Sequence, residues 1–130
     1  MIHAHPDGKR AGSRHYLHAE NSAAALQFIV ENGVLGEKYN VVGEKVMVNL
    51  ELSYIIYGYI KEWNDARGID TPPANFELTT FDPNRPGHDL RYAMNPDKLL
   101  SMGYAHPVGF DEGLKRTVLW TLEHQNWLGL

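Results

Sequence analysis

The stretch Arg85-Pro86-Gly87-His88-Asp89-Leu90-Arg91-Tyr92 places two guanidiniums, an imidazole and a phenol within eight residues. Its proline fixes one φ angle and its glycine tolerates a positive one, so the pair predicts a sharp turn. Such a turn presents Arg85 and His88 together, and a guanidinium binds a phosphate through two parallel hydrogen bonds. We therefore predict an anion-recognition loop between two ordered elements. The alternative is a solvated turn whose arginines pair with Asp82 and Asp89.

Residues 85–94 resemble the R-P-G-H-D-x-R-Y-A-I-D signature of the extended short-chain dehydrogenase/reductases that act on nucleotide sugars. Within that group the resemblance is to the dTDP-glucose 4,6-dehydratase and NAD-dependent epimerase/dehydratase family. Five further segments resemble the family in the same order and spacing. They are residues 7–18 (G-x-G-x-x-x-R-D-W-x-Y-V), 37–43 (G-x-x-Y-N-I-G-G), 49–52 (T-N-L-E), 95–104 (D-x-S-K-x-x-x-x-L-G-W) and 110–114 (F-E-E-G-L). Six ordered matches are much stronger evidence than one motif.

The resemblance implies a small α/β fold, namely the C-terminal substrate-binding domain of an extended short-chain dehydrogenase/reductase. We expect three to four helices with short strands, and no Rossmann domain. Residues 1–15 are expected to be an N-terminal arm or loop, and residues 16–130 a single substrate-binding domain.

The resemblance also implies which residues face a nucleotide diphosphate sugar. Arg14 and Arg85 would neutralise its pyrophosphate, and Asn40 offers a donor and an acceptor to a hydroxyl or base edge. The alternative for Asn40 is a strand-end residue that bonds its own backbone, and for Tyr92 it is simple packing. The complete predicted substrate-binding set is Arg14, Asn40, Asn84, Arg85, Pro86, Gly87, His88 and Tyr92.

The motifs that bind the cofactor and carry catalysis in such an enzyme are not found in this sequence. The sequence contains no G-x-x-G-x-x-G turn for a dinucleotide. Tyr57 and Lys61 match the family's Tyr-x-x-x-Lys pattern, but they follow the T-N-L-E helix start and lie in an amphipathic pattern, so we interpret the match as chance. We therefore expect no catalytic and no cofactor-binding residue here, an inactive chain in isolation, and NAD in the complete enzyme.

The sequence departs from the family pattern at several positions. Asn84 stands where the family has an aspartate before Arg-Pro-Gly, and His15, His18 and Glu44 replace an acid, a tyrosine and a glycine. These departures leave open which sugar is used, and whether the reaction is a dehydration or an epimerisation.

Composition narrows the class of protein. Hydrophobic residues make up 43% of the 130 residues, which favours a folded chain. Cysteine is absent, which excludes disulfides and thiolate chemistry. The net charge of −4 and the scattered basic residues disfavour nucleic acid as a partner. No apolar run approaches the length of a membrane span, so a cytoplasmic protein without membrane contact is expected.

Four histidines near the N-terminus suggest a competing metal site. His3, His5, His15 and His18 have spacings that zinc or nickel sites use. In an extended segment, however, residues three apart point to opposite faces, and no acidic pattern completes a metal motif. We therefore expect a mobile, solvated histidine-bearing arm.

Periodicity predicts helices alternating with strands. The expected elements are a helix capped by Asn21 or Ser22 and ending near Gly33, strands over 38–42 and 46–48, a helix capped by Asn49 and ending near Gly68, a strand over 76–81, a short helix opened by Asn95-Pro96, and a helix over 110–126.

Two classes of function remain open. In the first, the chain is the substrate-binding part of a sugar-nucleotide enzyme and works with a Rossmann domain or chain. In the second, it is a free-standing binding or assembly module that kept the fold and lost the reaction. Without a Rossmann partner an apolar face would be exposed, so we expect a homodimer or an exchange of the N-terminal arm between copies.

Overall fold

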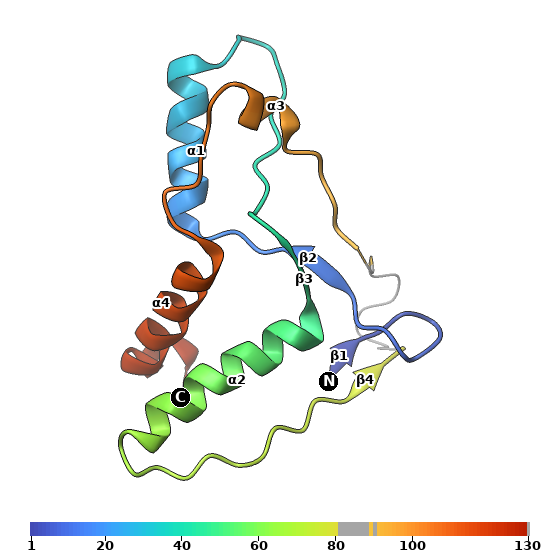
Figure 1. The fold of residues 1–130 in the computed structure, drawn as a ribbon, viewed down its shortest axis with the longest axis vertical. Helices are drawn as coiled ribbons and strands as arrows, with labels where there is room; N and C mark the ends of the chain where they lie inside the picture. Colours follow the sequence, from blue (N-terminus) through green and yellow to red (C-terminus); the bar gives the residue numbers. More distant parts are fainter. Residues whose placement is uncertain (81–88, 90, 130) are drawn as a thin grey trace.

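The computed structural model describes residues 1–80, 89 and 91–129. Its strands are β1 (Ile2–His3), β2 (Ser13–His15), β3 (Val46–Val48) and β4 (Leu78–Thr79), and its helices are α1 (Ala19–Asn32), α2 (Asn49–Asp65), α3 (Asp97–Ser101) and α4 (Phe110–Glu123), followed by the 3₁₀ helix η1 (Gln125–Leu128). Four helices with a few short strands confirm the predicted small α/β fold (Figure 1).

The strands form two separate two-stranded sheets. Strand β1 pairs in parallel with β4, and β2 pairs antiparallel with β3. Residues 1–15 therefore contain two paired strands where we expected an arm or loop. Strands of two or three residues are too short for a periodic pattern, which is why the sequence does not reveal them. The domain boundary at residue 15 stays a prediction.

Helix α1 begins earlier than predicted. Its N-cap is His18, whose Nδ1 accepts from the Glu20 N–H at 3.3 Å, so the prediction of a cap at Asn21 or Ser22 is wrong. Histidine is not among the usual capping residues, which explains the error. Gly33 ends the helix, as predicted.

The other helices lie close to their predicted ranges. Asn49 is the first residue of α2 and Val48 is its cap, so the predicted cap at Asn49 is wrong by one residue. The Asn95 Oδ1 accepts from the Asp97 N–H at 2.7 Å and opens α3, as the sequence predicts. Helix α4 ends at Glu123, and η1 replaces the last predicted turn. None of the described helices combines the length and apolarity needed to cross a membrane.

The strand predicted over residues 38–42 is wrong. The segment belongs to no strand of the described structure and has no pairing partner there. Its apolar and polar residues alternate as in a strand, but a strand needs a neighbouring one to bond with. The strand predicted over 76–81 is reduced to β4, and residue 81 lies outside the described residues.

The core joins the N- and C-terminal parts of the chain. Ala25 of α1, Leu99 of α3 and Tyr104 form a buried cluster, and Phe28, Ile29, Tyr39 and Val41 pack around it. Helix α2 packs against α4, and β3 leads directly into α2 (Figure 1).

Candidate functional site

Arg14 lies in the middle of β2, and its guanidinium reaches the segment that follows the Pro-Gly turn. Nη2 donates to the Asp89 carbonyl at 2.6 Å, and Nη1 donates to the Ser13 carbonyl at 2.7 Å. The guanidinium carbon also lies 4.2 Å from the centre of the Tyr92 ring. Charge-assisted hydrogen bonds and a cation over an aromatic face both resist displacement. Arg14 therefore holds Asp89 and Tyr92 against β2.

The backbone joins the same two segments. Ser13 and Arg91 form a parallel bridge, and the Tyr92 N–H donates to the Ser13 carbonyl at 3.4 Å. The chain leaving the predicted anion-recognition loop is thus fastened to β2. The loop residues themselves, Asn84, Arg85, Pro86, Gly87 and His88, lie outside the described residues, and their roles stay predictions.

Asn40 holds the other end of the segment. Its Nδ2 donates to the Asn95 carbonyl at 3.0 Å, a bond to a distant backbone group instead of its own. Residues 91–95 run from beside β2 to α3 (Figure 1); Arg14 bonds the carbonyl of Asp89 just before them, and Asn40 bonds the carbonyl of Asn95 at their end. The fold therefore brings three of the predicted residues, Arg14, Asn40 and Tyr92, to one segment.

The chemistry of this segment suits a polar, anionic ligand. The Tyr92 side chain is 54% exposed although it packs on Arg14, and Asn40 is also exposed. The Tyr92 phenol beside the Arg14 guanidinium supplies a hydrogen-bond donor next to a positive charge, and the Asn40 amide offers further donors at the other end of the segment. Packing and ligand contact are thus compatible at Tyr92, since one face meets Arg14 and much of the ring remains accessible.

A separate pocket of about 180 Å³ lies between the β2–α1 link and the start of α4. Its lining includes Tyr16, Glu44, Phe110 and Leu114. The Glu44 carboxylate accepts from the Phe110 N–H at 2.7 Å, and the Tyr16 hydroxyl donates to Asn49 Oδ1 at 3.0 Å, so both polar groups have partners inside the chain. Ligand pockets usually span about 300–1,000 Å³. This pocket is too small for a nucleotide sugar.

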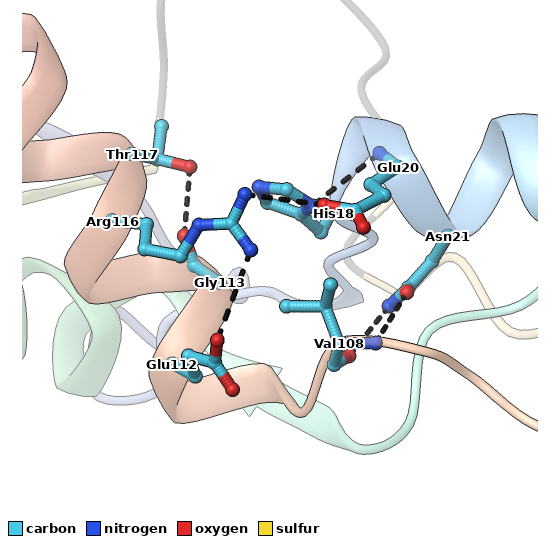
Figure 2. A network of polar contacts seen from close by, with 8 residues as sticks. All are labelled: His18, Glu20, Asn21, Val108, Glu112, Gly113, Arg116 and Thr117. Carbon is cyan, nitrogen blue, oxygen red and sulfur yellow. Dashed lines mark hydrogen bonds and ion pairs between the residues drawn. The ribbon is translucent and has the colours of Figure 1, made fainter.

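Figure 2 shows how His18 joins α1 to α4. Its Nδ1 caps α1, and its ring lies so close to Gly113 that a Cβ there would be 3.1 Å away. Arg116 adds ion pairs to Glu20 at 3.1 Å and to Glu112 at 3.7 Å. His18 is therefore a cap and a packing residue in this fold.

Two other N-terminal histidines have polar contacts within the chain. His15 lies in β2, and its Nδ1 bonds the Gly43 carbonyl at 3.0 Å. His5 contacts Asp7 at 3.4 Å. Within the described part of the chain, no group of three or more His, Cys, Asp or Glu side chains is arranged to hold a metal ion.

The Tyr57–Lys61 pair lies on α2, where both side chains have other partners. The Tyr57 hydroxyl donates to the Pro72 carbonyl at 3.0 Å, and the Lys61 Nζ donates to Asp65 at 2.6 Å. The hydrogen bond to Asp65 raises the pKa of Lys61, whereas lysine acid–base chemistry near neutral pH needs a lowered one. These contacts agree with a chance match to the motif.

The raised pKa of Tyr16 predicts that the folded state loses stability at alkaline pH. Burial raises the pKa of Tyr16 above its ordinary value of 10.0, so the folded state holds the phenolic proton more tightly than the unfolded chain. This contribution is complete below about pH 10 and is lost as pH rises through the folded pKa. We expect the free energy of unfolding to fall as the pH rises above about 10, and Tyr16→Phe to lessen the fall. Urea denaturation across this range measures it. An equal fall in the variant would assign the titration elsewhere, for example to Tyr104, whose pKa burial also raises.

The sequence of this chain is similar to part of several known enzymes. No model of a known protein family matches the chain. The dTDP-glucose 4,6-dehydratase of Neisseria meningitidis is 35% identical over 116 residues, which are 88% of this chain and 32% of that protein. An Escherichia coli protein of the same name is 32% identical over 122 residues, 93% of this chain and 32% of the relative. The chain is homologous to the C-terminal part of the dTDP-glucose 4,6-dehydratases. A probable dTDP-glucose 4,6-dehydratase of Sinorhizobium fredii is 36% identical over 123 residues, 92% of this chain and 33% of the relative.

A solved structure gives the same result. The crystal structure of Bacillus anthracis dTDP-glucose 4,6-dehydratase in complex with NAD matches 96% of this chain and 35% of its own, with a TM-score of 0.70 and 25% identity. The predicted family resemblance and fold class are therefore confirmed. The chain spans about a third of the length of the curated relatives that it matches.

The described residues do not fit NAD. A dinucleotide pyrophosphate binds at a helix N-terminus after a Gly-rich turn, where backbone N–H groups and the helix dipole attract it. The three long helices instead have acidic first turns, with Glu20 in α1, Glu51 in α2, and Asp111 and Glu112 in α4. These carboxylates repel a pyrophosphate, and the 130 residues contain no G-x-x-G-x-x-G turn.

Proposed function

We propose that this chain is the substrate-binding part of an NAD-dependent nucleotide-sugar 4,6-dehydratase or epimerase, most similar to dTDP-glucose 4,6-dehydratase. The observation that carries the proposal is the match of 88–93% of the chain to dehydratases of that name. Support comes from Asp89 and Asn95, whose carbonyls accept hydrogen bonds from Arg14 and Asn40.

The substrate in this proposal is a nucleotide diphosphate sugar. Arg85 neutralises its pyrophosphate together with Arg14, His88 donates to a phosphate or to the sugar, and Asn84, Pro86 and Gly87 complete the binding set. Arg14 adds positive charge while holding Tyr92, and Asn40 bonds a hydroxyl or base edge. These roles follow the family resemblance, and the contacts of Arg14 and Asn40 are compatible with them.

The chemistry in this proposal belongs to a Rossmann domain or chain that acts with this one. When bound there, NAD accepts and returns a hydride, so that the sugar is oxidised at C4 before elimination or epimerisation. This chain binds and orients the substrate and is inactive alone. We also propose a cytoplasmic location and a homodimer of the isolated chain, which light scattering over a wide concentration range tests.

Calorimetric titration tests the substrate assignment. We expect dTDP-glucose, UDP-glucose or GDP-mannose to bind saturably to the purified chain, and NAD not to bind. The sugar nucleotide that binds most tightly identifies the nucleotide base that the site accepts. Binding of NAD by this chain alone would contradict the proposal, as would a reconstituted enzyme that binds no sugar nucleotide.

Arg85→Ala is expected to weaken sugar-nucleotide binding in the reconstituted enzyme by about 1.5–3 kcal/mol, the contribution of a hydrogen bond to a charged group. The matched control is Arg67→Ala, two residues after the end of α2, where the guanidinium carbon lies 3.7 Å from the centre of the Trp63 ring. Titration calorimetry gives both affinities, and thermal unfolding checks the fold. Equal affinities in the two variants would remove Arg85 from the site.

A further inference from the structure

The His106 ring joins two buried parts of the chain that lie far apart in the sequence. Its Nε2 is 2.9 Å from the Val42 carbonyl oxygen, and its Nδ1 is 3.3 Å from the Tyr104 hydroxyl. That hydroxyl donates onward to the Asn21 carbonyl of α1 at 2.8 Å. Val42, Tyr104 and Asn21 are buried, and His106 is half-buried. We call this row of hydrogen bonds, from Val42 through His106 and Tyr104 to Asn21, the His106 link.

The hydrogens available to the His106 link fix the state of the ring. The Val42 carbonyl can only accept, so Nε2 must carry a hydrogen. The Tyr104 hydroxyl has a single hydrogen, and it gives this hydrogen to the Asn21 carbonyl, which is the nearer acceptor. The hydroxyl therefore presents a lone pair to Nδ1, which must carry a hydrogen as well. An imidazole with hydrogens on both nitrogens is the imidazolium ion, so the link is complete only when His106 is charged.

A neutral His106 ring leaves the link one hydrogen short. If the hydrogen stays on Nε2, then Nδ1 presents a lone pair to the Tyr104 hydroxyl. The hydroxyl must then either turn its hydrogen away from Asn21 or face Nδ1 with a lone pair of its own. Each arrangement loses one hydrogen bond among buried groups, and such a loss destabilises the fold. The proton on Nδ1 therefore decides whether Val42 is bonded through to α1.

The charged groups around the ring do not replace these oxygen acceptors. Within the described residues, the polar contacts of the ring are the two to Val42 and Tyr104. Glu20 of α1 pairs with Arg116, and Glu37 pairs with Lys98 of α3. The titratable groups on the elements around the ring are Tyr104, Glu20 and Glu31 of α1, Glu37, Lys38, Tyr39, Glu44 and Lys45 beside Val42, and Asp97 and Lys98 of α3. The positive charge on His106 is therefore stabilised by a carbonyl and a hydroxyl, not by a carboxylate.

We propose that the His106 link is a proton-dependent fastening, which holds the Val42 segment to α1 when His106 is charged and loses one of its bonds when His106 is neutral. Histidine changes charge between about pH 5 and 8, so the change falls near neutral pH. The Tyr104 hydroxyl stays protonated throughout this range, because burial raises the pKa of Tyr104 above its ordinary value of 10.0. The fastening belongs to the fold itself and does not depend on the ligand proposed above.

The direction of the pH effect follows from where the second proton is held. The folded chain offers it the Tyr104 oxygen, a contact that the unfolded chain lacks, so the folded state binds this proton more tightly. Stability therefore falls with rising pH wherever the folded state holds more protons than the unfolded one. The contribution of the link is complete at about pH 5 and is lost as the pH rises toward about 8.

Urea denaturation of the 130-residue chain and of Tyr104→Phe tests the proposal. Phenylalanine keeps the ring that packs against Phe28 and His106 but removes the hydroxyl. Between about pH 5.5 and 8, we expect the unfolding equilibrium constant of the native chain to rise about tenfold more than that of the variant. The matched control is Tyr57→Phe, which also removes a hydroxyl that donates to a distant carbonyl, that of Pro72 at 3.0 Å, and is expected to leave the rise unchanged.

Nitrogen NMR of the His106 ring reads the same state directly. In the native chain we expect both ring nitrogens to be protonated at about pH 5.5, and the hydrogen to remain on Nε2 at about pH 8. In Tyr104→Phe the change is expected about one pH unit lower, which corresponds to the tenfold difference in stability. An equal midpoint in the two proteins, or a neutral ring with its hydrogen on Nδ1, would overturn the proposal. If Tyr104→Phe does not fold, the native ring decides: a ring still neutral at about pH 5.5 contradicts the link, and a doubly protonated one that moves to the Nε2 form supports it.

Discussion

Gly43→Ala is expected to lower the free energy of unfolding by about 3 kcal/mol or more, because overpacking a rigid contact forces the backbone to move. Gly43 is buried against the β2–α1 link. An added Cβ would overlap the Tyr16 carbonyl oxygen and lie 2.8 Å from its carbon. Both atoms belong to the backbone, so no side-chain rotation relieves the overlap. The Gly43 carbonyl also bonds His15 at 3.0 Å, and a shift that makes room would strain this bond. Urea denaturation of the chain measures the loss.

Gly58→Ala is the matched control for this substitution. Gly58 lies inside α2, and a Cβ there meets no atom within 4 Å. The change is expected to raise the free energy of unfolding by about 0.5–1 kcal/mol, since alanine loses less backbone entropy in a helix. Opposite signs for the two variants would locate the effect at the Tyr16 contact. A loss of unfolding free energy well below about 3 kcal/mol in Gly43→Ala would show that the backbone at Tyr16 moves aside at little cost.

Long periodic segments made most of the fold predictable. The helices over Ala19–Asn32, Asn49–Asp65 and Phe110–Glu123 each repeat apolar residues for several turns, and so each was identifiable from the sequence. Strands β1 and β2 have only two and three residues, and their pairing depends on residues more than thirty positions away. No local pattern encodes such a pairing, which is why a loop was expected there.

The segment at residues 38–42 fails for a different reason. Its sequence has the local character of a strand, and its side chains at Tyr39 and Val41 pack as those of a strand would. A strand is defined by hydrogen bonds to a neighbour, which sequence reasoning assumes and the described chain does not supply. The prediction was correct about propensity and wrong about pairing.

The candidate site was predictable as a motif but not as a set of contacts. The order of the six family segments pointed to Arg14, Asn40 and Tyr92. Nothing in the spacing indicates that Arg14 bonds the carbonyl of Asp89, 75 residues away, or that Asn40 bonds that of Asn95. Such bonds arise from tertiary packing. The assignments at residues 84–88 stay predictions.

Asn21→Ala is expected to cost about 3–4 kcal/mol of unfolding free energy, because it leaves two buried backbone groups without partners at about 1–3 kcal/mol each. Asn21 is 5% exposed and Val108 is 3% exposed. The Asn21 Nδ2 donates to the Val108 carbonyl at 2.8 Å, and its Oδ1 accepts from the Val108 N–H at 3.0 Å (Figure 2). One amide thus satisfies both backbone groups of a buried residue 87 positions away. Chemical denaturation compares the variant with the native chain.

Two further variants separate this pairing from other effects of the substitution. Asn32→Ala removes an amide from the exposed end of the same helix, where it bonds only the Phe28 carbonyl at 3.0 Å, and is expected to cost at most about 0.5 kcal/mol. Asn21→Asp keeps the acceptor for the Val108 N–H but turns a carboxylate oxygen toward the Val108 carbonyl, so at neutral pH it is expected to destabilise as well, and less at acid pH, where the protonated carboxyl can donate. If Asn21→Ala costs no more than Asn32→Ala, the two bonds do not hold α1 to the chain before α4. If the acid recovery of Asn21→Asp is seen, the need for a donor toward the Val108 carbonyl is established, and with it the reason that an amide occupies this position.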